Sequence, residues 1–216
     1  MEEDEGAPGS PHSPHHRART TGSALLRGRG LDRLIPAPHE ILLAGFSFGG
    51  IVGGLAAARP GSRIRTLVLL GSGGLGLPPL PTPGLLPVTS AMAPDEITHA
   101  HRENLCRLMI ADPRKADDLA VLVHMDNLRR ARFKSGTIPS SSVLLNALPA
   151  IQARIAGIWS GRDAFAGCRA ERVDAQRRVL ASVQPDIDFR VIAGAGHWTP
   201  YEAADEVHAA LLDMLA

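Results

Sequence analysis

The apolar positions of this chain form short continuous runs that are separated by longer stretches of mixed polarity. Three of the runs have the length of a strand, at residues 41–44, 66–70 and 155–159, and the alternating segment 188–192 predicts a fourth strand. The run over 66–70 is almost entirely apolar, which is typical of a parallel strand buried on both faces. A small-residue segment over 50–59 follows the first run and suits a right-handed crossover helix. The pattern predicts an α/β fold with a mostly parallel sheet flanked by helices.

Helical segments are expected after the second strand and at the end of the chain. Gly, Pro and Leu dominate residues 71–87, so this stretch should be a loop that leaves the sheet. Pro94 is followed by two acidic residues, which marks a helix start. Further helices are expected over 113–132, 140–148 and 203–215. The last of these is amphipathic and should cover the sheet.

The beginning of the chain has a different composition. Residues 1–22 are rich in Pro, Gly, Ser, His and Arg, so they cannot bury a core and should be disordered. We expect a helix over 23–34. Histidines 12, 15 and 16 form a short histidine-rich tract, but no further ligands at fixed spacing follow them. We therefore predict no metal site.

A serine stands between the first strand and the helix that follows it, in the pentapeptide Gly45-Phe46-Ser47-Phe48-Gly49. On a sharp strand-to-helix turn, a serine hydroxyl stands clear of the backbone and can attack a substrate carbonyl. The glycines on either side should let the strand and the helix approach closely. The pattern predicts a nucleophile at Ser47, with the backbone N–H of Phe48 as a donor to the oxyanion.

An acid and a histidine follow the third and fourth predicted strands. Asp163 comes after the strand predicted over 155–159, and His197 comes after the strand predicted over 188–192. The carboxyl ends of parallel strands meet at one edge of the sheet, where Ser47 also lies. His197 would take the serine proton as general base, and Asp163 would orient the imidazole. Alone, either residue could equally be an ordinary loop residue.

The motifs GFSFGG, GIWSGRD and GAGHW resemble the α/β-hydrolase superfamily, and most closely its subgroup of meta-cleavage-product C–C hydrolases. The resemblance covers residues 39–216, and the stretch 101–133 is similar to the helical cap of that subgroup. It implies a substrate pocket walled by Phe46 and by Trp198, because a tryptophan follows the catalytic histidine in those relatives.

The resemblance also implies a domain organisation. Residues 1–38 would be a disordered or atypical N-terminal segment, and 39–78 the first part of the hydrolase core. Residues 79–148 would be the cap, and 149–216 the second part of the core.

One departure from the superfamily pattern concerns the chain before Ser47. Four strands normally precede the elbow strand, but only 46 residues precede Ser47, and none of the upstream histidines is followed by the glycine of an oxyanion loop. We expect a chain that is truncated at its N-terminus and lacks the usual first strands. The strand over 41–44 would then be an apolar edge, open to pairing with another chain in a homo-oligomer.

Composition narrows the class of protein. The net charge is +1 and 44% of residues are hydrophobic, which argues against a nucleic-acid surface and for a sizeable core. Two cysteines give no disulfide framework, and no apolar run has the length of a membrane span. We expect a cytoplasmic protein that acts on a small molecule, without a membrane or nucleic-acid partner and without a cofactor.

Three functions remain open. The first is a serine-type hydrolase that cleaves a C–C bond of a small apolar keto acid, for which Arg129 and Arg130 could bind the carboxylate. The second is a carboxylic ester hydrolase with the same triad. The third is a catalytically impaired fragment or a binding protein that keeps the triad residues.

Overall fold

The computed structural model describes residues 30, 31 and 33–216. The predictions of disorder over 1–22, of most of the helix over 23–34 and of no metal site at histidines 12, 15 and 16 lie outside these residues. Residues 30, 31, 33 and 34 are helical, which agrees with the last part of the predicted range.

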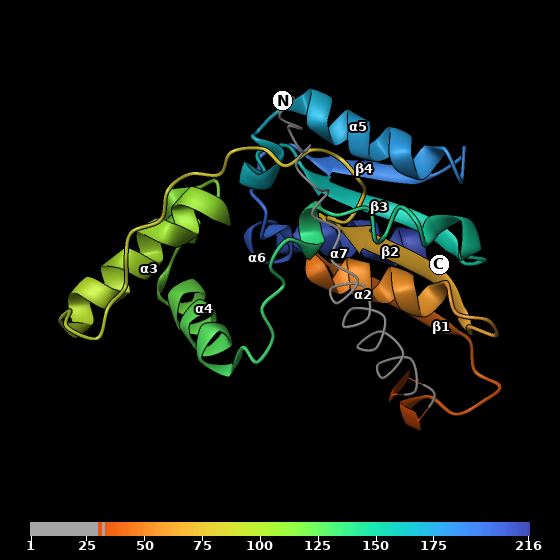
Figure 1. Ribbon diagram of the computed structural model, residues 1–216, viewed down its shortest axis with the longest axis horizontal. Coiled ribbons are helices and arrows are strands. Elements are labelled where there is room, and N and C mark those ends of the chain that lie inside the picture. Colours follow the sequence, from red (N-terminus) through yellow and green to blue (C-terminus); the bar gives the residue numbers. More distant parts are fainter. Residues whose placement is uncertain (1–29, 32) are drawn as a thin grey trace, which may run out of the picture.

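A parallel sheet forms the centre of the described chain (Figure 1). Its strands are β1 (Ile41–Phe46), β2 (Ile64–Leu70), β3 (Arg154–Ser160) and β4 (Asp188–Ile192). They lie side by side in chain order, and every neighbouring pair is parallel. The α/β prediction and the four predicted strands are therefore confirmed.

The two faces of the sheet are covered by different helices. Successive side chains of a strand point to opposite faces, so neighbouring residues of β2 contact different helices. On one face, Leu67 and Leu69 of β2 pack with residues of α2 (Phe48–Ala57) and α5 (Ala170–Ala181). On the other face, Val68 and Leu70 pack with α7 (Ala204–Leu215). Helix α7 confirms the expected amphipathic C-terminal helix, whereas α5 was missed by the sequence patterns.

A helical insert, which we define as residues 71–153, connects β2 to β3, and the helices within it stand to one side of the sheet (Figure 1). Its helices are α3 (Pro94–Leu108), which begins at the predicted proline, and α4 (Asp118–Arg130). The second helix begins later than predicted. A short 3-10 turn over Pro113–Lys115 comes first, and the Asp117 carboxylate then caps α4 by accepting the N–H of Ala120.

The predicted helix over 140–148 is wrong. This stretch consists mainly of turns between two short 3-10 helices at Ile138–Ser140 and Leu148–Ala150. The backbone N–H groups of Leu144 and Leu145 both donate to the carbonyl of Gly74, at 2.9 Å. Because the donors are used in this long-range contact, they are not available for a regular helix.

Strand β1 lies at the edge of the described sheet, where β2 is its one neighbour. Its side chains include the exposed Leu42 and the buried Ile41.

No helix of the described chain is long and apolar enough to cross a membrane.

Candidate active site

Ser47 is the single residue between the end of β1 and the start of α2. Its backbone has φ 50° and ψ −118°, and φ in this range is strained for a residue with a side chain. The Ser47 N–H donates to the carbonyl of Leu70 on the neighbouring strand at 2.7 Å, which holds the turn against the sheet edge. The chain therefore stores backbone strain at the predicted nucleophile.

Glycines let the strand and the helix meet at this turn. A side chain at Gly45 would place its Cβ 2.7 Å from the Cα of Gly50, and one at Gly50 would place its Cβ 1.7 Å from the Oγ of Ser72. A Cβ at Gly49 would meet nothing within 4 Å. The prediction that Gly45 is needed for close approach agrees with this geometry, but the second glycine with that role is Gly50 and not Gly49.

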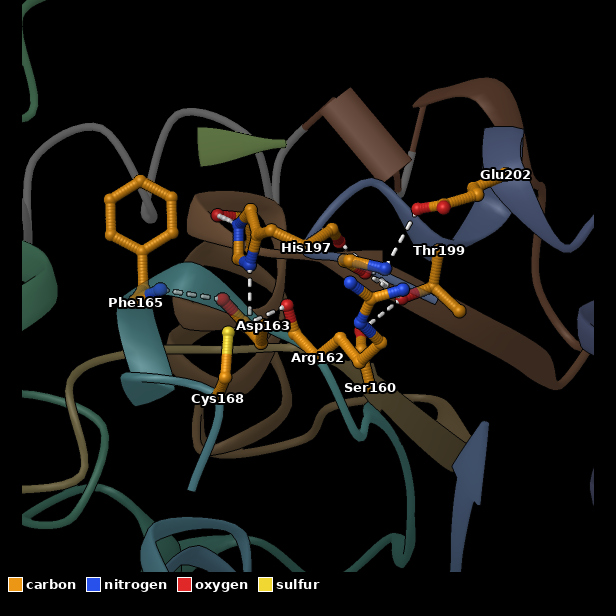
Figure 2. Close-up of polar contacts among 10 residues, drawn as sticks. Ser160, Arg162, Asp163, Phe165, Cys168, His197, Thr199 and Glu202 are labelled. Carbon is orange, nitrogen blue, oxygen red and sulfur yellow. Dashed lines mark hydrogen bonds and ion pairs between the residues drawn. The ribbon is translucent and has the colours of Figure 1, made fainter. Parts of the chain in front are cut away.

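Three polar side chains form an unbroken line of hydrogen bonds. The Nε2 of His197 lies 2.9 Å from the Oγ of Ser47, and its Nδ1 lies 2.8 Å from the Oδ2 of Asp163. The other carboxylate oxygen of Asp163 accepts the N–H of Phe165 at 2.8 Å. His197 and Asp163 are buried, and Figure 2 shows the hydrogen bond between them. The structure thus brings together the three residues that the sequence singled out.

The loops after β3 and β4 hold each other in place. The N–H of Gly161 donates to the carbonyl of Ile192 at 2.9 Å, and the N–H of Arg162 donates to the carbonyl of Ala195 at 3.0 Å. Beneath His197, the hydroxyls of Ser160 and Thr199 are hydrogen-bonded to each other (Figure 2). These contacts fix the acid and the histidine relative to the sheet edge.

Two aromatic rings contact this group. Of the five phenylalanines of the chain, Phe46 and Phe165 lie against His197, and Phe48 follows Ser47 in the sequence. The rings of Phe46 and Phe165 lie 5.1 and 4.7 Å from the imidazole of His197. Phe133, from the insert, stacks on Phe48 at 5.3 Å.

Sequence reasoning named Phe46 but missed Phe133 and Phe165. Phe133 and Phe165 are 45% and 43% exposed, although large apolar side chains are usually buried. The position of Phe165, two residues after the candidate acid, was a signal that could have been used.

Trp198 ends the loop of residues 193–198 after β4, which we call the histidine loop, and its side chain packs against the insert. Its ring stacks on Tyr201 at 4.6 Å and packs with the insert cluster around Leu105 and Ile110. Its backbone N–H donates to the carbonyl of Met109 at 2.7 Å. Its expected role as a pocket wall stays a prediction.

Another pocket, a metal site or a disulfide could also mark a functional site. A hollow of about 680 Å³ in the insert is lined by residues of the 86–92 loop and of α3, and none of the three hydrogen-bonded residues lines it. Within residues 30, 31 and 33–216, no three His, Cys, Asp or Glu side chains are grouped to hold a metal ion. The two cysteines are free.

Solved structures with a similar fold cover most of this chain. A serine hydrolase, CCSP0084, from the polyaromatic hydrocarbon-degrading bacterium Cycloclasticus zankles is 19% identical with a TM-score of 0.58, over 88% of this chain and 66% of that one. A putative aryl esterase from Burkholderia cenocepacia is 19% identical with a TM-score of 0.64, over 96% and 75%. The meta-cleavage product hydrolase CumD from Pseudomonas fluorescens, in a mutant form complexed with acetates, is 16% identical with a TM-score of 0.55, over 81% and 64%.

These likenesses concern the fold, and this chain spans slightly less than two thirds of CCSP0084 and of CumD. No curated protein sequence matches the chain significantly. The sequence does match the Alpha/beta hydrolase family over residues 5–210, which is nearly the whole chain. The chain belongs to the Alpha/beta hydrolase family.

Proposed function

We propose that this protein is a serine-type hydrolase that cleaves a carboxylic ester of a small apolar substrate through Ser47, His197 and Asp163. The observation that carries the proposal is the line of hydrogen bonds from Asp163 through His197 to a serine held at φ 50° between a strand and a helix. This arrangement has the parts that acyl transfer needs: a nucleophile, a base within reach and an acid that orients the base.

The reaction follows from these positions. The Nε2 of His197 takes the Ser47 proton as the Oγ forms a bond to the ester carbonyl carbon. The same proton then passes to the leaving alkoxide oxygen as the C–O bond breaks. Water attacks the resulting acyl-enzyme with His197 again as base, which releases the acid and restores Ser47. Asp163 accepts from Nδ1 and stabilises the imidazolium in both halves of the reaction.

The backbone N–H of Phe48 is the proposed donor to the oxyanion. Phe48 is the first residue of α2, and the first N–H groups of a helix have no acceptor within it. The positive end of the helix dipole adds to the attraction for a developing negative charge. One such donor is worth about 3 kcal/mol in the transition state.

The surroundings favour an apolar substrate and an ester. The rings of Phe46 and Phe165 lie against His197, and Phe133 stacks on Phe48, the residue after Ser47. The carboxylate of a keto acid would need a cation, and Arg129 and Arg130 were the candidates for that role. Both already pair with Asp126 at 2.6 Å on the surface of α4. Cleavage of a C–C bond in a keto acid is therefore the second candidate.

Labelling with a fluorophosphonate probe tests the proposal. The modified peptide is mapped by mass spectrometry, with Ser47→Ala as the control. Labelling of Ser47 in the unchanged protein alone is the expected result. Absence of labelling in a folded sample would refute the proposal and leave the impaired or binding protein.

Turnover of short aryl esters, compared with that of a vinylogous keto acid, then separates the two bond types. Faster turnover of the ester is expected. Preference for the keto acid would reverse the order of the two candidates.

A further inference from the structure

We infer that Glu202 is a positioning residue that fixes the loop carrying His197 and ties this loop to the helical insert. As a statement about catalysis, the inference rests on the proposed function. Its structural part, that one carboxylate holds both segments, can be measured without any activity.

Glu202 lies on the short helix α6 (Thr199–Glu202), and only 7% of its surface is exposed. Its Oε2 accepts the N–H of Gly196 at 2.7 Å, and its Oε1 accepts the N–H of Asp112 at 2.7 Å. The N–H of Ala111 lies 3.0 Å from both oxygens. A buried carboxylate is costly without partners, and charge-assisted bonds from backbone N–H groups offset that cost.

The three donors belong to two segments that are distant in the sequence. Gly196 immediately precedes His197, whereas Ala111 and Asp112 lie about 90 residues earlier than Glu202, just after α3. In Figure 2, a dashed line joins the Glu202 carboxylate to the backbone next to His197. The carboxylate therefore connects the backbone at the candidate base directly to the insert.

Two further contacts bring the same segments together. A Cβ at Gly196 would lie 2.7 Å from the N of Ala111 and 2.8 Å from the O of Met109, so the two backbones touch without room for a side chain. The N–H of Trp198 donates to the carbonyl of Met109. The backbone on each side of His197 is thus bound to residues 109–112, and Glu202 supplies the bonds on the Gly196 side.

The position of the imidazole depends on this loop. Misplacing a catalytic group by about 1 Å can lower a rate on the order of 100-fold. Glu202 bonds to the backbone next to His197. Its loss should therefore reduce the rate of the chemical step more than the binding of substrate.

Hydrogen exchange measured by mass spectrometry tests the structural part. Glu202→Gln keeps the shape of the side chain but replaces one acceptor oxygen by a donor, and Glu206→Gln, at an exposed position of α7, is the matched control. We expect faster exchange in peptides covering both 109–112 and 194–198 in Glu202→Gln, and no change in the control. Faster exchange in one segment alone, or in neither, would overturn the inference.

Kinetics test the positioning role. With an aryl ester, kcat of Glu202→Gln should fall about 10- to 100-fold with KM changed less than about threefold, and labelling of Ser47 should slow in parallel. Tyr201→Phe serves as a second comparison because it removes the 2.5 Å bond from the tyrosine hydroxyl to Asp117 and leaves Glu202 unchanged. It should leave kcat within about twofold. A lower melting temperature with unchanged kcat in Glu202→Gln would mean a merely structural role.

Failure of the hydrolase proposal can be distinguished from failure of the inference about Glu202. If wild-type Ser47 is not labelled, the hydrolase proposal fails, and hydrogen exchange still decides whether Glu202 joins the two segments. If Glu202→Gln does not fold, Glu202→Asp keeps the charge but withdraws it by one methylene, and the same exchange pattern is expected from it.

Discussion

A hydrogen bond between Ser47 and His197 joins the serine turn, the turn at Ser47 between β1 and α2, to the histidine loop. The chain positions these two segments by different means. Ser47 is held by its neighbours in sequence, with β1 ending at residue 46, α2 starting at residue 48 and two backbones in contact at Gly45 and Gly50. His197 is held from afar, by Asp163 at 34 residues' distance and by the insert at about 90 through Glu202. The first is fixed by local sterics and the second by long-range polar contacts, so they should fail differently when changed.

The largest effect is expected from Asp163→Asn, on the histidine side. Both carboxylate oxygens accept, one from His197 and one from the N–H of Phe165. If the asparagine oxygen stays with Phe165, its amide group faces Nδ1 and favours the wrong imidazole tautomer. We expect kcat for an aryl ester to fall about 10³- to 10⁴-fold with the fold retained. Asp174→Asn, on the exposed side of α5, is the control, and a fall of less than about tenfold in Asp163→Asn would contradict the triad.

At the serine turn, we expect a substitution to reduce stability rather than to act mainly on the rate. Gly50→Ala drives a Cβ into the Oγ of Ser72 and to 2.9 Å from the carbonyl oxygen of Gly45, so the free energy of unfolding should fall by about 1–3 kcal/mol. Gly49→Ala is the matched control, because a Cβ there meets open space, and it should leave stability unchanged or raise it by up to about 1 kcal/mol, since alanine favours a helix. Denaturant titration measures both. Equal effects of the two substitutions would mean that close packing does not shape the turn.

The same contrast explains what the sequence could predict. The serine turn was predictable because strand, glycine and helix signals all fall within a few residues. The order of Asp163 and His197 was predictable because each follows a strand. The support of His197 by Glu202 was not, since it joins segments about 90 residues apart. Long-range contacts also explain the error over 140–148, where the carbonyl of Gly74 takes the N–H groups of Leu144 and Leu145.

A smaller effect should distinguish the aromatic rings on the two sides. Phe165 lies edge-on to the imidazole, whereas Phe133 stacks on Phe48 next to the serine. An aromatic pair contributes about 0.5–1.5 kcal/mol, so Phe165→Ala should lower kcat/KM for an aryl ester about 2- to 12-fold, partly through kcat. Phe133→Ala should act through KM alone. Steady-state kinetics with both variants measures this, and identical changes in kcat would remove the distinction.

The smallest effect is a loss of stability at low pH. It begins at His124 in the insert and should extend from there to the histidine loop. His124 of α4 is half-buried, and its ring lies 5.4 Å from that of His101 on α3. Burial, and secondly the nearby His101, lower the pKa of His124 below its ordinary value of 6.5. The unfolded chain therefore binds a proton more readily than the folded one, and stability is lost as the pH falls through 6.5.

Unfolding between about pH 7.5 and 5.5 should show this loss, and His124→Gln should flatten the profile. The carboxyl of Asp117 does not interfere, because the bond from the Tyr201 hydroxyl lowers its pKa from 3.8, below this window. If the insert and the histidine loop are joined as we infer, acid should also speed hydrogen exchange at 194–198, once corrected for the intrinsic rate, while leaving the serine turn protected. Equal loosening of the turn would show that the two sides of the site are one cooperative unit.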